Sequence, residues 1–400
     1  MSEFRKNKYP KIIMDTENNW PSAESLIKRI TSEEWGDILH HTHAANDLAS
    51  EDGDAGGFND ELKLLKMEFE SIKEAIKKLA ESTNTNVGDL SSPEIVKVDT
   101  VQNTIDAISE SPNGSIVKIT ASIDAETQAV KVEGKTITLN LNGNTVKSSN
   151  SNSTGLIVKD GKMIIDGQGI IVSNDPYKAG HTSGAIVVQD GGELIINSGK
   201  LKAVISENPT DLGQFGIAAY GKSNININGG EIETGWYCCT FNGSTTNPDS
   251  TLTINDGTLR SVADFALYLP IGNLVINGGT ISGAAGGISC NRGKVIINGG
   301  TVECSGGGNT GDWSDGTGGQ VNAAINLNGK YGAVDCEING GIIKSAGNNF
   351  LIVSGNTYPV AIKITGGYFS SKPNEEWIVD GYVCSETKNK DGYYVVTAAG

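Results

Sequence analysis

The chain has 400 residues and a formal net charge of −16, with 52 glycines but only 10 prolines. This composition excludes a collagen-like or proline-rich chain and argues against a surface that binds nucleic acid. No apolar run approaches the roughly 20 residues that cross a membrane, and no apolar segment follows the charged N-terminus, so we expect neither a membrane partner nor a secretory signal.

Residues 1–57 are predicted to form an N-terminal anchor arm with one short helix. A capping box, Thr31-Ser32-Glu33-Glu34, begins this helix, which leads into the motif His41-Thr42-His43. Two histidines at this spacing are candidate metal ligands, and a solvated polar surface is the alternative. A glycine-rich joint, residues 53–57, separates the arm from the next segment.

Residues 58–81 carry a heptad pattern that predicts a coiled-coil stalk. Its apolar seam, spaced alternately by four and three residues, consists of Phe58, Leu62, Leu65, Phe69, Ile72, Ile76 and Leu79. Lysine and glutamate fill most other positions. The spacing favours self-association without fixing the number of chains, and a single amphipathic helix packed on the rest of the chain is the alternative.

The histidine motif, followed by Asn46-Asp47-Leu48, resembles a segment of bacteriophage fibre proteins. In some trimeric fibres of this kind, the histidine pairs of three chains bind one octahedral metal ion. The resemblance therefore implies a homotrimer with a metal ion held by His41 and His43 on its axis. We expect no other cofactor.

Residues 96–370 contain a repeated phrase with apolar residues at offsets of zero, two and seven. The nine copies are Leu139/Leu141/Val146, Met163/Ile165/Ile170, Leu194/Ile196/Leu201, Ile225/Ile227/Ile232, Leu252/Ile254/Leu259, Leu274/Ile276/Ile281, Val295/Ile297/Val302, Cys336/Ile338/Ile343 and Ile362/Ile364/Phe369. The first two positions lie on one face of a strand. A corner residue and glycine follow, and the chain then returns an apolar residue to the same interior.

The corner residues fall at Asn142, Asp166, Asn197, Asn228, Asn255, Asn277, Asn298, Asn339 and Thr365. A constant phrase at variable spacing predicts a solenoid whose connections differ in length between coils. Before the first copy, Val101, Ile105 and Ile108 form one apolar helix face, which would cover the open first coil.

This pattern resembles the right-handed parallel β-helices of the pectate-lyase-like superfamily. The resemblance implies a mainly β fold, a right-handed single-stranded parallel β-helix over residues 96–370, behind the N-terminal helical and coiled-coil segment. The ending Gly366-Gly367-Tyr368-Phe369, with Gly381-Tyr382 and Gly392-Tyr393-Tyr394, resembles one found in β-helical proteins of gut bacteria and their phages. We interpret residues 371–400 as a C-terminal β cap.

The six cysteines, all in the C-terminal part, form no C-x-x-C pair. We expect them to be small buried residues of the strands, with a zinc site as the alternative.

Candidate carbohydrate contacts are aromatic residues, because an aromatic face stacks on a sugar. They are Trp236, Tyr237, Tyr268 and Trp313. For Trp236, packing between coils is the alternative. Trp313 lies in a long glycine-rich insertion between Asp312 and Asp315, the candidate catalytic carboxylates if the protein cleaves glycosidic bonds.

Three functions remain open from the sequence. The first is a structural phage fibre, on the head or tail, that binds other virion proteins through residues 1–57 and attaches to a host surface receptor or glycan. Such a protein would be made in the host cytoplasm and reside in the virion. The second is a polysaccharide depolymerase, a glycoside hydrolase or lyase on the same scaffold, and the third is a bacterial surface adhesin. A catalytic role is the less favoured expectation, and fibre precedent favours three chains.

Overall fold

The computed structural model describes residues 93–149, 154–173, 184–203, 215–243, 249–307, 322–354 and 357–400. The chain divides into two compact units, Met1–Ser92 and Pro93–Gly400, and the described residues all belong to the second. The anchor arm, the histidine pair and the heptad at 58–79 therefore lie outside the described residues.

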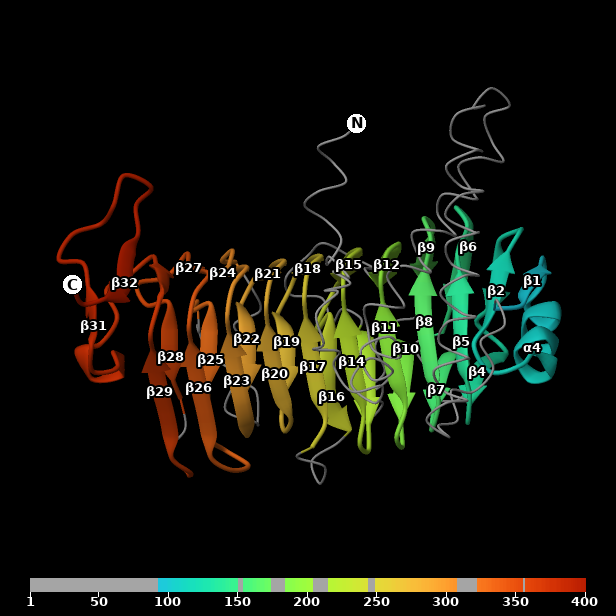
Figure 1. Ribbon diagram of the computed structural model, residues 1–400, viewed down its shortest axis with the longest axis horizontal. Coiled ribbons are helices and arrows are strands. Elements are labelled where there is room, and N and C mark those ends of the chain that lie inside the picture. Colours follow the sequence, from blue (N-terminus) through green and yellow to red (C-terminus); the bar gives the residue numbers. More distant parts are fainter. Residues whose placement is uncertain are drawn as a thin grey trace, which may run out of the picture. The chain divides into compact units, whose positions relative to one another are not determined.

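The strands of the described ranges form three long sheets, in which neighbouring strands come from successive coils (Figure 1). Sheet A consists of β1 (Ile95–Val98), β2 (Ser115–Ile119), β5 (Thr136–Asn140), β8 (Lys162–Asp166), β11 (Glu193–Ile196), β14 (Asn224–Ile227), β17 (Thr251–Ile254), β20 (Asn273–Ile276), β23 (Gly293–Ile297), β26 (Val334–Ile338) and β29 (Val360–Ile364). Sheet B consists of β3 (Ile123–Ala125), β6 (Thr145–Ser148), β9 (Ile170–Val172), β12 (Lys200–Ala203), β15 (Glu231–Thr234), β18 (Thr258–Ser261), β21 (Thr280–Gly283), β24 (Thr301–Cys304), β27 (Ile342–Ser345), β30 (Gly367–Phe369), β32 (Tyr394–Ala398) and β31 (Tyr382–Cys384). Sheet C consists of β28 (Leu351–Val353), β25 (Ile325–Leu327), β22 (Gly286–Cys290), β19 (Phe265–Leu269), β16 (Cys239–Gly243), β13 (Phe215–Tyr220), β10 (Gly184–Gln189), β7 (Gly155–Lys159) and β4 (Ala129–Glu133).

Each coil contributes one strand to sheet A, then one to sheet B and one to sheet C. The pairs are parallel throughout the described strands, except where β32 pairs antiparallel with β30 and β31. Such an arrangement is a mainly β, solenoid-like fold, consistent with the predicted β-helix.

The repeated phrase supplies the interior of sheets A and B. Leu274 and Ile276 of β20 and Ile281 of β21 are fully buried, while the residues between them reach the surface. The residues at offset zero pair in register from coil to coil, as Leu252 does with Leu274 and Leu274 with Val295. The register confirms the seven copies that begin at Leu194 and end at Phe369.

The alignment of the first copy is wrong by two residues. Leu139 pairs with Ile165 and Asn140 with Asp166, so the corner residue equivalent to Asp166 is Asn140 and not Asn142. The corner of this coil is longer, and Asn142 adopts a left-handed conformation within it, with φ of 47°. Side chains alternate in strands, so a shift of two residues keeps the same face and is invisible to the apolar pattern.

The second copy has one extra residue in its corner. Ile171, not Ile170, pairs with Leu201 and is buried. The offset of seven is therefore eight in this coil.

An asparagine ladder joins the A–B corners of successive coils. In each coil the side-chain Nδ2 donates to Oδ1 of the equivalent asparagine in the preceding coil, at 2.8–2.9 Å. The ladder runs through Asn197, Asn228, Asn255, Asn277, Asn298 and Asn339, and the Thr365 hydroxyl donates to Asn339 Oδ1 at its end. The predicted corner residues from Asn197 to Thr365 thus stack in one line.

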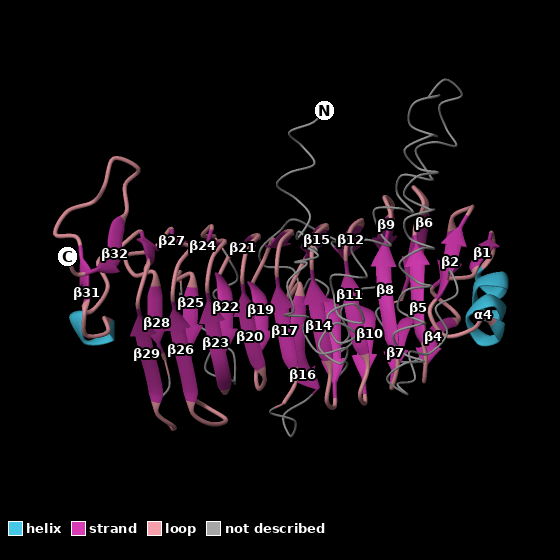
Figure 2. Ribbon diagram, in the orientation of Figure 1, coloured by secondary structure: helices cyan, strands magenta, loops and turns pink. Residues whose placement is uncertain are grey.

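Both ends of the solenoid carry short helical segments (Figure 2). At the first coil, α4 (Val101–Glu110) contacts β1 to β4 and buries Ile108, which confirms the predicted capping helix. Lys135 Nζ donates to three carbonyl oxygens at the end of α4, at 2.9–3.0 Å. At the last coil, η2 (Glu375–Trp377) contacts β29, and β32 pairs with β30. No helix within the described ranges is long and apolar enough to cross a membrane.

Candidate functional site

Sheet C differs from the other two sheets because most of its strands, though not β4 and β28 at its two edges, are buried on both faces. Every residue of β19, β22 and β25 is buried, whereas strands of sheets A and B alternate between buried and partly exposed positions. Strands buried on both faces read as continuous apolar runs without alternation. The candidate functional residues of the described part of the chain lie on or beside this sheet.

Three of the four aromatic residues singled out in the sequence lie together. Trp236 and Tyr237, at the B–C corner before β16, stack with a ring-centroid distance of 5.5 Å, and each also stacks on Phe215 at 5.3 Å and 5.2 Å. Tyr237 stacks in turn on Tyr268 of β19 at 4.8 Å. We call these four residues the aromatic stack.

The aromatic stack is buried, with exposed fractions of 4% for Trp236 and Tyr268 and 6% for Tyr237. A sugar stacks on a ring face that solvent reaches. The burial therefore supports packing between coils as the role of Trp236, and the same role applies to Tyr237 and Tyr268. Contact of a sugar with these rings stays a prediction.

Asp264, near Tyr268 in the sequence, is also buried and shapes the next B–C corner. Its Oδ1 accepts a hydrogen bond from the backbone N–H of Phe265 at 2.7 Å, and its own N–H donates to Ser261 Oγ at 3.1 Å. This geometry is that of a turn-forming aspartate.

The predicted catalytic candidates Asp312 and Asp315, and Trp313 between them, lie outside the described residues. Their segment connects β24 to β25, so it belongs to a B–C connection, as Trp236 and Tyr237 do.

A row of buried polar side chains occupies the C-terminal half of sheet C. Ser354 Oγ donates to Asn326 Oδ1 at 2.6 Å, and Asn291 Nδ2 donates to Tyr268 Oη at 3.4 Å. Three atoms of this row are buried without a hydrogen-bond partner: Ser289 Oγ, Asn291 Oδ1 and Asn326 Nδ2. A buried polar atom without a partner costs about 1–3 kcal/mol, and such atoms in a folded protein mark places for water or a ligand.

Two tyrosines near this row are exposed, and neither is among the candidate residues predicted from the sequence. Tyr331, between β25 and β26, is 38% exposed, and Tyr358, between β28 and β29, is 49% exposed. The Lys330 ammonium lies 5.3 Å from the centroid of the Tyr331 ring. A signal was available, because each tyrosine is a large side chain in a short segment rich in glycine, asparagine or proline, where no core residue is expected.

The cysteines are all free thiols, and five of the six are buried, which confirms their predicted place among the strands. Burial raises the pKa of the Cys238 and Cys290 thiols to about 12. These thiols are therefore protonated and unreactive near neutral pH. Among the described residues, no three His, Cys, Asp or Glu side chains gather in a way that could hold a metal ion.

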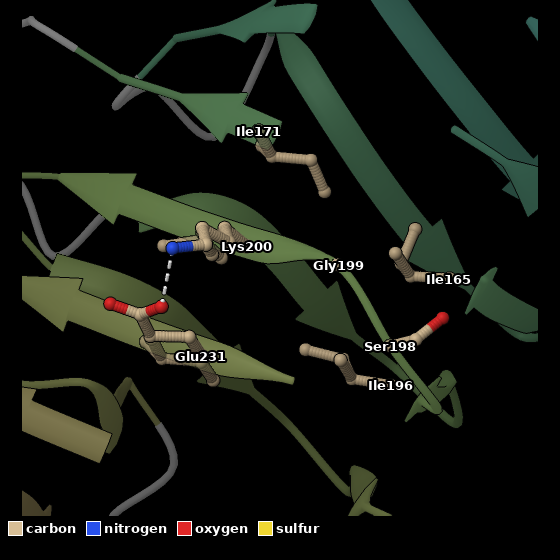
Figure 3. Close-up of a pocket in the computed structure, with 9 residues that line it drawn as sticks. Ile165, Ile171, Ile196, Ser198, Gly199, Lys200 and Glu231 are labelled. Atoms are coloured by element: carbon tan, nitrogen blue, oxygen red, sulfur yellow. Dashed lines mark ion pairs between the residues drawn. The ribbon is translucent and has the colours of Figure 1, made fainter. Parts of the chain in front are cut away.

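A small cavity lies under the A–B corner between β8, β11 and β12 (Figure 3). Ile165, Ile171 and Ile196 line it, and the ion pair between Lys200 and Glu231, 2.7 Å long, lies at its edge. Its volume of about 10 Å³ is at the lower limit for a single water molecule. This cavity is a packing defect and not a ligand site.

No family model, curated protein or solved structure matches the chain.

Proposed function

We propose that the chain is a structural fibre or appendage protein of a phage virion, on the head or tail. Residues 1–57 anchor it to other virion proteins, and residues 58–81 associate as a three-chain coiled coil. The solenoid is a right-handed parallel β-helix of the pectate-lyase-like type that displays a surface for attachment to a host receptor or glycan. A metal ion bound by His41 and His43 of three chains belongs to the same proposal.

The observation that carries the proposal is a continuous solenoid directly after a heptad segment. One hydrophobic core cluster extends from Val98 to Val396, and the inter-coil ladder gives the solenoid a uniform corner. The first coil is covered by α4, and at the last coil β32 and β31 extend sheet B as antiparallel strands. In this proposal, association occurs through the heptad and not through the sheet edges.

The test is the mass of the full-length chain in solution, measured by light scattering. We expect three chains per particle for the native sequence and one chain when Leu65 and Ile72 of the seam are both changed to glutamate. Lys66→Glu and Lys73→Glu, at neighbouring positions off the seam, form the matched control and leave the mass at three chains. A native protein of one chain would refute the stalk and, with it, the fibre.

A depolymerase on the same scaffold is the second candidate, favoured by the two carboxylates Asp312 and Asp315 that flank Trp313 in the sequence. Release of reducing sugar from host capsule or lipopolysaccharide would support it. We expect Asp312→Asn and Asp315→Asn to abolish such a release. Unchanged release would remove these carboxylates from the catalytic role.

A further inference from the structure

The C–A corners at the end of the solenoid carry positive charge without acidic residues. The stretches 270–272, 291–293, 328–333 and 357–359 contain Arg292 and Lys330 and no aspartate or glutamate. Acids outnumber bases in the chain by 47 to 31. These corners are therefore a local exception to an acidic protein, and such a place favours an anion.

Backbone hydrogen bonds hold the corners together. The Tyr331 N–H donates to the Asn291 carbonyl at 3.2 Å, and the Tyr358 N–H donates to the Gly329 carbonyl at 3.0 Å. The backbone of both exposed tyrosines is thus fixed to corners of neighbouring coils. A backbone that is already ordered loses little conformational entropy when a ligand binds.

The side chain of Arg292 lies against Gly332, the residue after Tyr331. A methyl group on Gly332 would come within 2.7 Å of Arg292 Nε, so the arginine side chain passes directly over the glycine next to Tyr331. Within the described part of the chain, Arg292 is in no ion pair, whereas Arg260 binds Glu233. A guanidinium held in place without a carboxylate is suited to bind one from a ligand.

The buried polar row continues inward from the same corners. Asn291, whose carbonyl accepts from Tyr331, has an Oδ1 atom without a partner, and Asn326 has a free Nδ2; both side chains are fully buried. These amides lie beneath the corners and do not reach solvent, so the groups available to a ligand are the exposed rings and the guanidinium.

We propose that Arg292, Lys330, Tyr331 and Tyr358 form a binding site for an anionic saccharide at the last C–A corners of the solenoid. The tyrosine rings stack on the sugar, and the two cations bind its carboxylate, sulfate or phosphate group. This inference rests on the proposed attachment function and gives the attachment surface a position and a ligand class.

The experiment is binding of the full-length protein to an array of oligosaccharides that carry carboxylate, sulfate or phosphate groups, beside their neutral counterparts. We expect binding to anionic members that weakens as salt rises. The double variant Tyr331→Ala/Tyr358→Ala should bind at least tenfold more weakly, and Arg292→Glu should lose both affinity and salt dependence.

Matched controls lie elsewhere on the solenoid. Tyr368→Ala removes an equally exposed tyrosine of sheet B, and Lys97→Glu reverses a charge at the first coil. Both should bind as the native protein does, and all variants should keep its circular dichroism and thermal midpoint.

Three outcomes would overturn the site. Equal loss of binding in the control variants would show a general surface effect, and native affinity in the corner variants would leave glycan attachment standing with its site elsewhere. A change in the number of chains per particle caused by the tyrosine variant would make the corners an interface between copies. Absence of binding to every array member would refute the site and the glycan attachment together.

Discussion

The asparagine ladder allows a direct test of how the coils are joined. Asn277 stands in its middle, donating to Asn255 Oδ1 at 2.8 Å and accepting from Asn298 Nδ2 at 2.9 Å. Asn277→Ala removes both hydrogen bonds, whereas Asn277→Asp retains the acceptor and removes only the donor. The alanine variant therefore measures the loss of both hydrogen bonds, and the aspartate variant tests whether Asn277 is the donor to Asn255.

The magnitude follows from the number of bonds. A hydrogen bond contributes about 0.5–1.5 kcal/mol net, so Asn277→Ala should lower the free energy of unfolding by roughly 1–2 kcal/mol, the lower part of the range for two bonds because water reaches these side chains. In Asn277→Asp a carboxylate faces the Asn255 oxygen with no proton between them. At pH 7 we expect a loss of at least the same size.

The aspartate variant has a pH signature that the alanine variant lacks. Repulsion from the Asn255 oxygen favours the protonated carboxyl in the folded state, so its folded pKa is raised above its unfolded value. Such a group is most favourable to folding below the unfolded pKa, and that contribution is lost as pH rises through the folded pKa. The stability deficit of Asn277→Asp relative to the native protein should therefore shrink as pH falls from 7 towards 4, and that of Asn277→Ala should stay constant.

The assay is urea unfolding of each variant and the native protein at several pH values, with the slope of the transition checked for constancy because long solenoids can unfold in parts. Asn348→Asp, an exposed asparagine outside the ladder, is the matched control. If Asn277→Asp were as stable as the native protein at pH 7, the reasoning would be refuted, because the side-chain amides of Asn197, Asn228 and Asn255 would then have rotated to exchange donor and acceptor. We do not expect this rotation, because it would turn Asn197 Oδ1 towards the coil of Asp166, whose carboxylate can only accept a hydrogen bond.

Three further predictions concern the corners, the cap and the thiols. Gly279→Ala should lower the free energy of unfolding by at least about 2 kcal/mol, because Gly279 has φ of +77° and a methyl group there would lie 2.7 Å from the Gly257 oxygen. Gly392 has a similar φ but open space around it, so Gly392→Ala measures the backbone strain alone in the same urea titration. Lys135→Met leaves three carbonyls of α4 without their cation and should cost about 1–3 kcal/mol, with faster amide exchange in α4 as the local readout. A thiol reagent at pH 8 should label Cys384 first and the buried cysteines only in denaturant; prompt labelling of all six would contradict the buried positions.

The sequence was sufficient to predict sheets A and B, because each copy of the phrase carries its own apolar pattern and its own corner. It was ambiguous at the first copy, where Ile137, Leu139 and Leu141 all have the same parity and the pattern fits either frame. Pairing with the next coil decides between the frames, and this pairing is a property of the fold. The error at Ile170 has the same origin, since two adjacent isoleucines leave the length of the corner undetermined.

Sheet C could not be located from periodicity. A strand such as Phe265–Leu269 is buried on both faces and has no alternation, so nothing in the sequence separates it from the connections around it. The burial of the aromatic candidates could not be predicted either, because Tyr237 stacks on Phe215 and Tyr268, which lie in neighbouring coils. Its burial depends on these contacts, which composition does not reveal.

The ladder also explains where this solenoid can carry function. Successive ladder residues are separated by 21 to 41 positions, yet each pair of side chains is held at 2.8–2.9 Å. The A–B corner therefore keeps its geometry, and differences in length fall on the other connections. The longest separation, from Asn298 to Asn339, contains the B–C connection of the acidic insertion and the C–A corner of Tyr331. Recognition of a partner can vary at these connections without disturbing the coils that support them. The depolymerase candidates and two of the four residues of the proposed saccharide site, Lys330 and Tyr331, fall within this interval of the sequence.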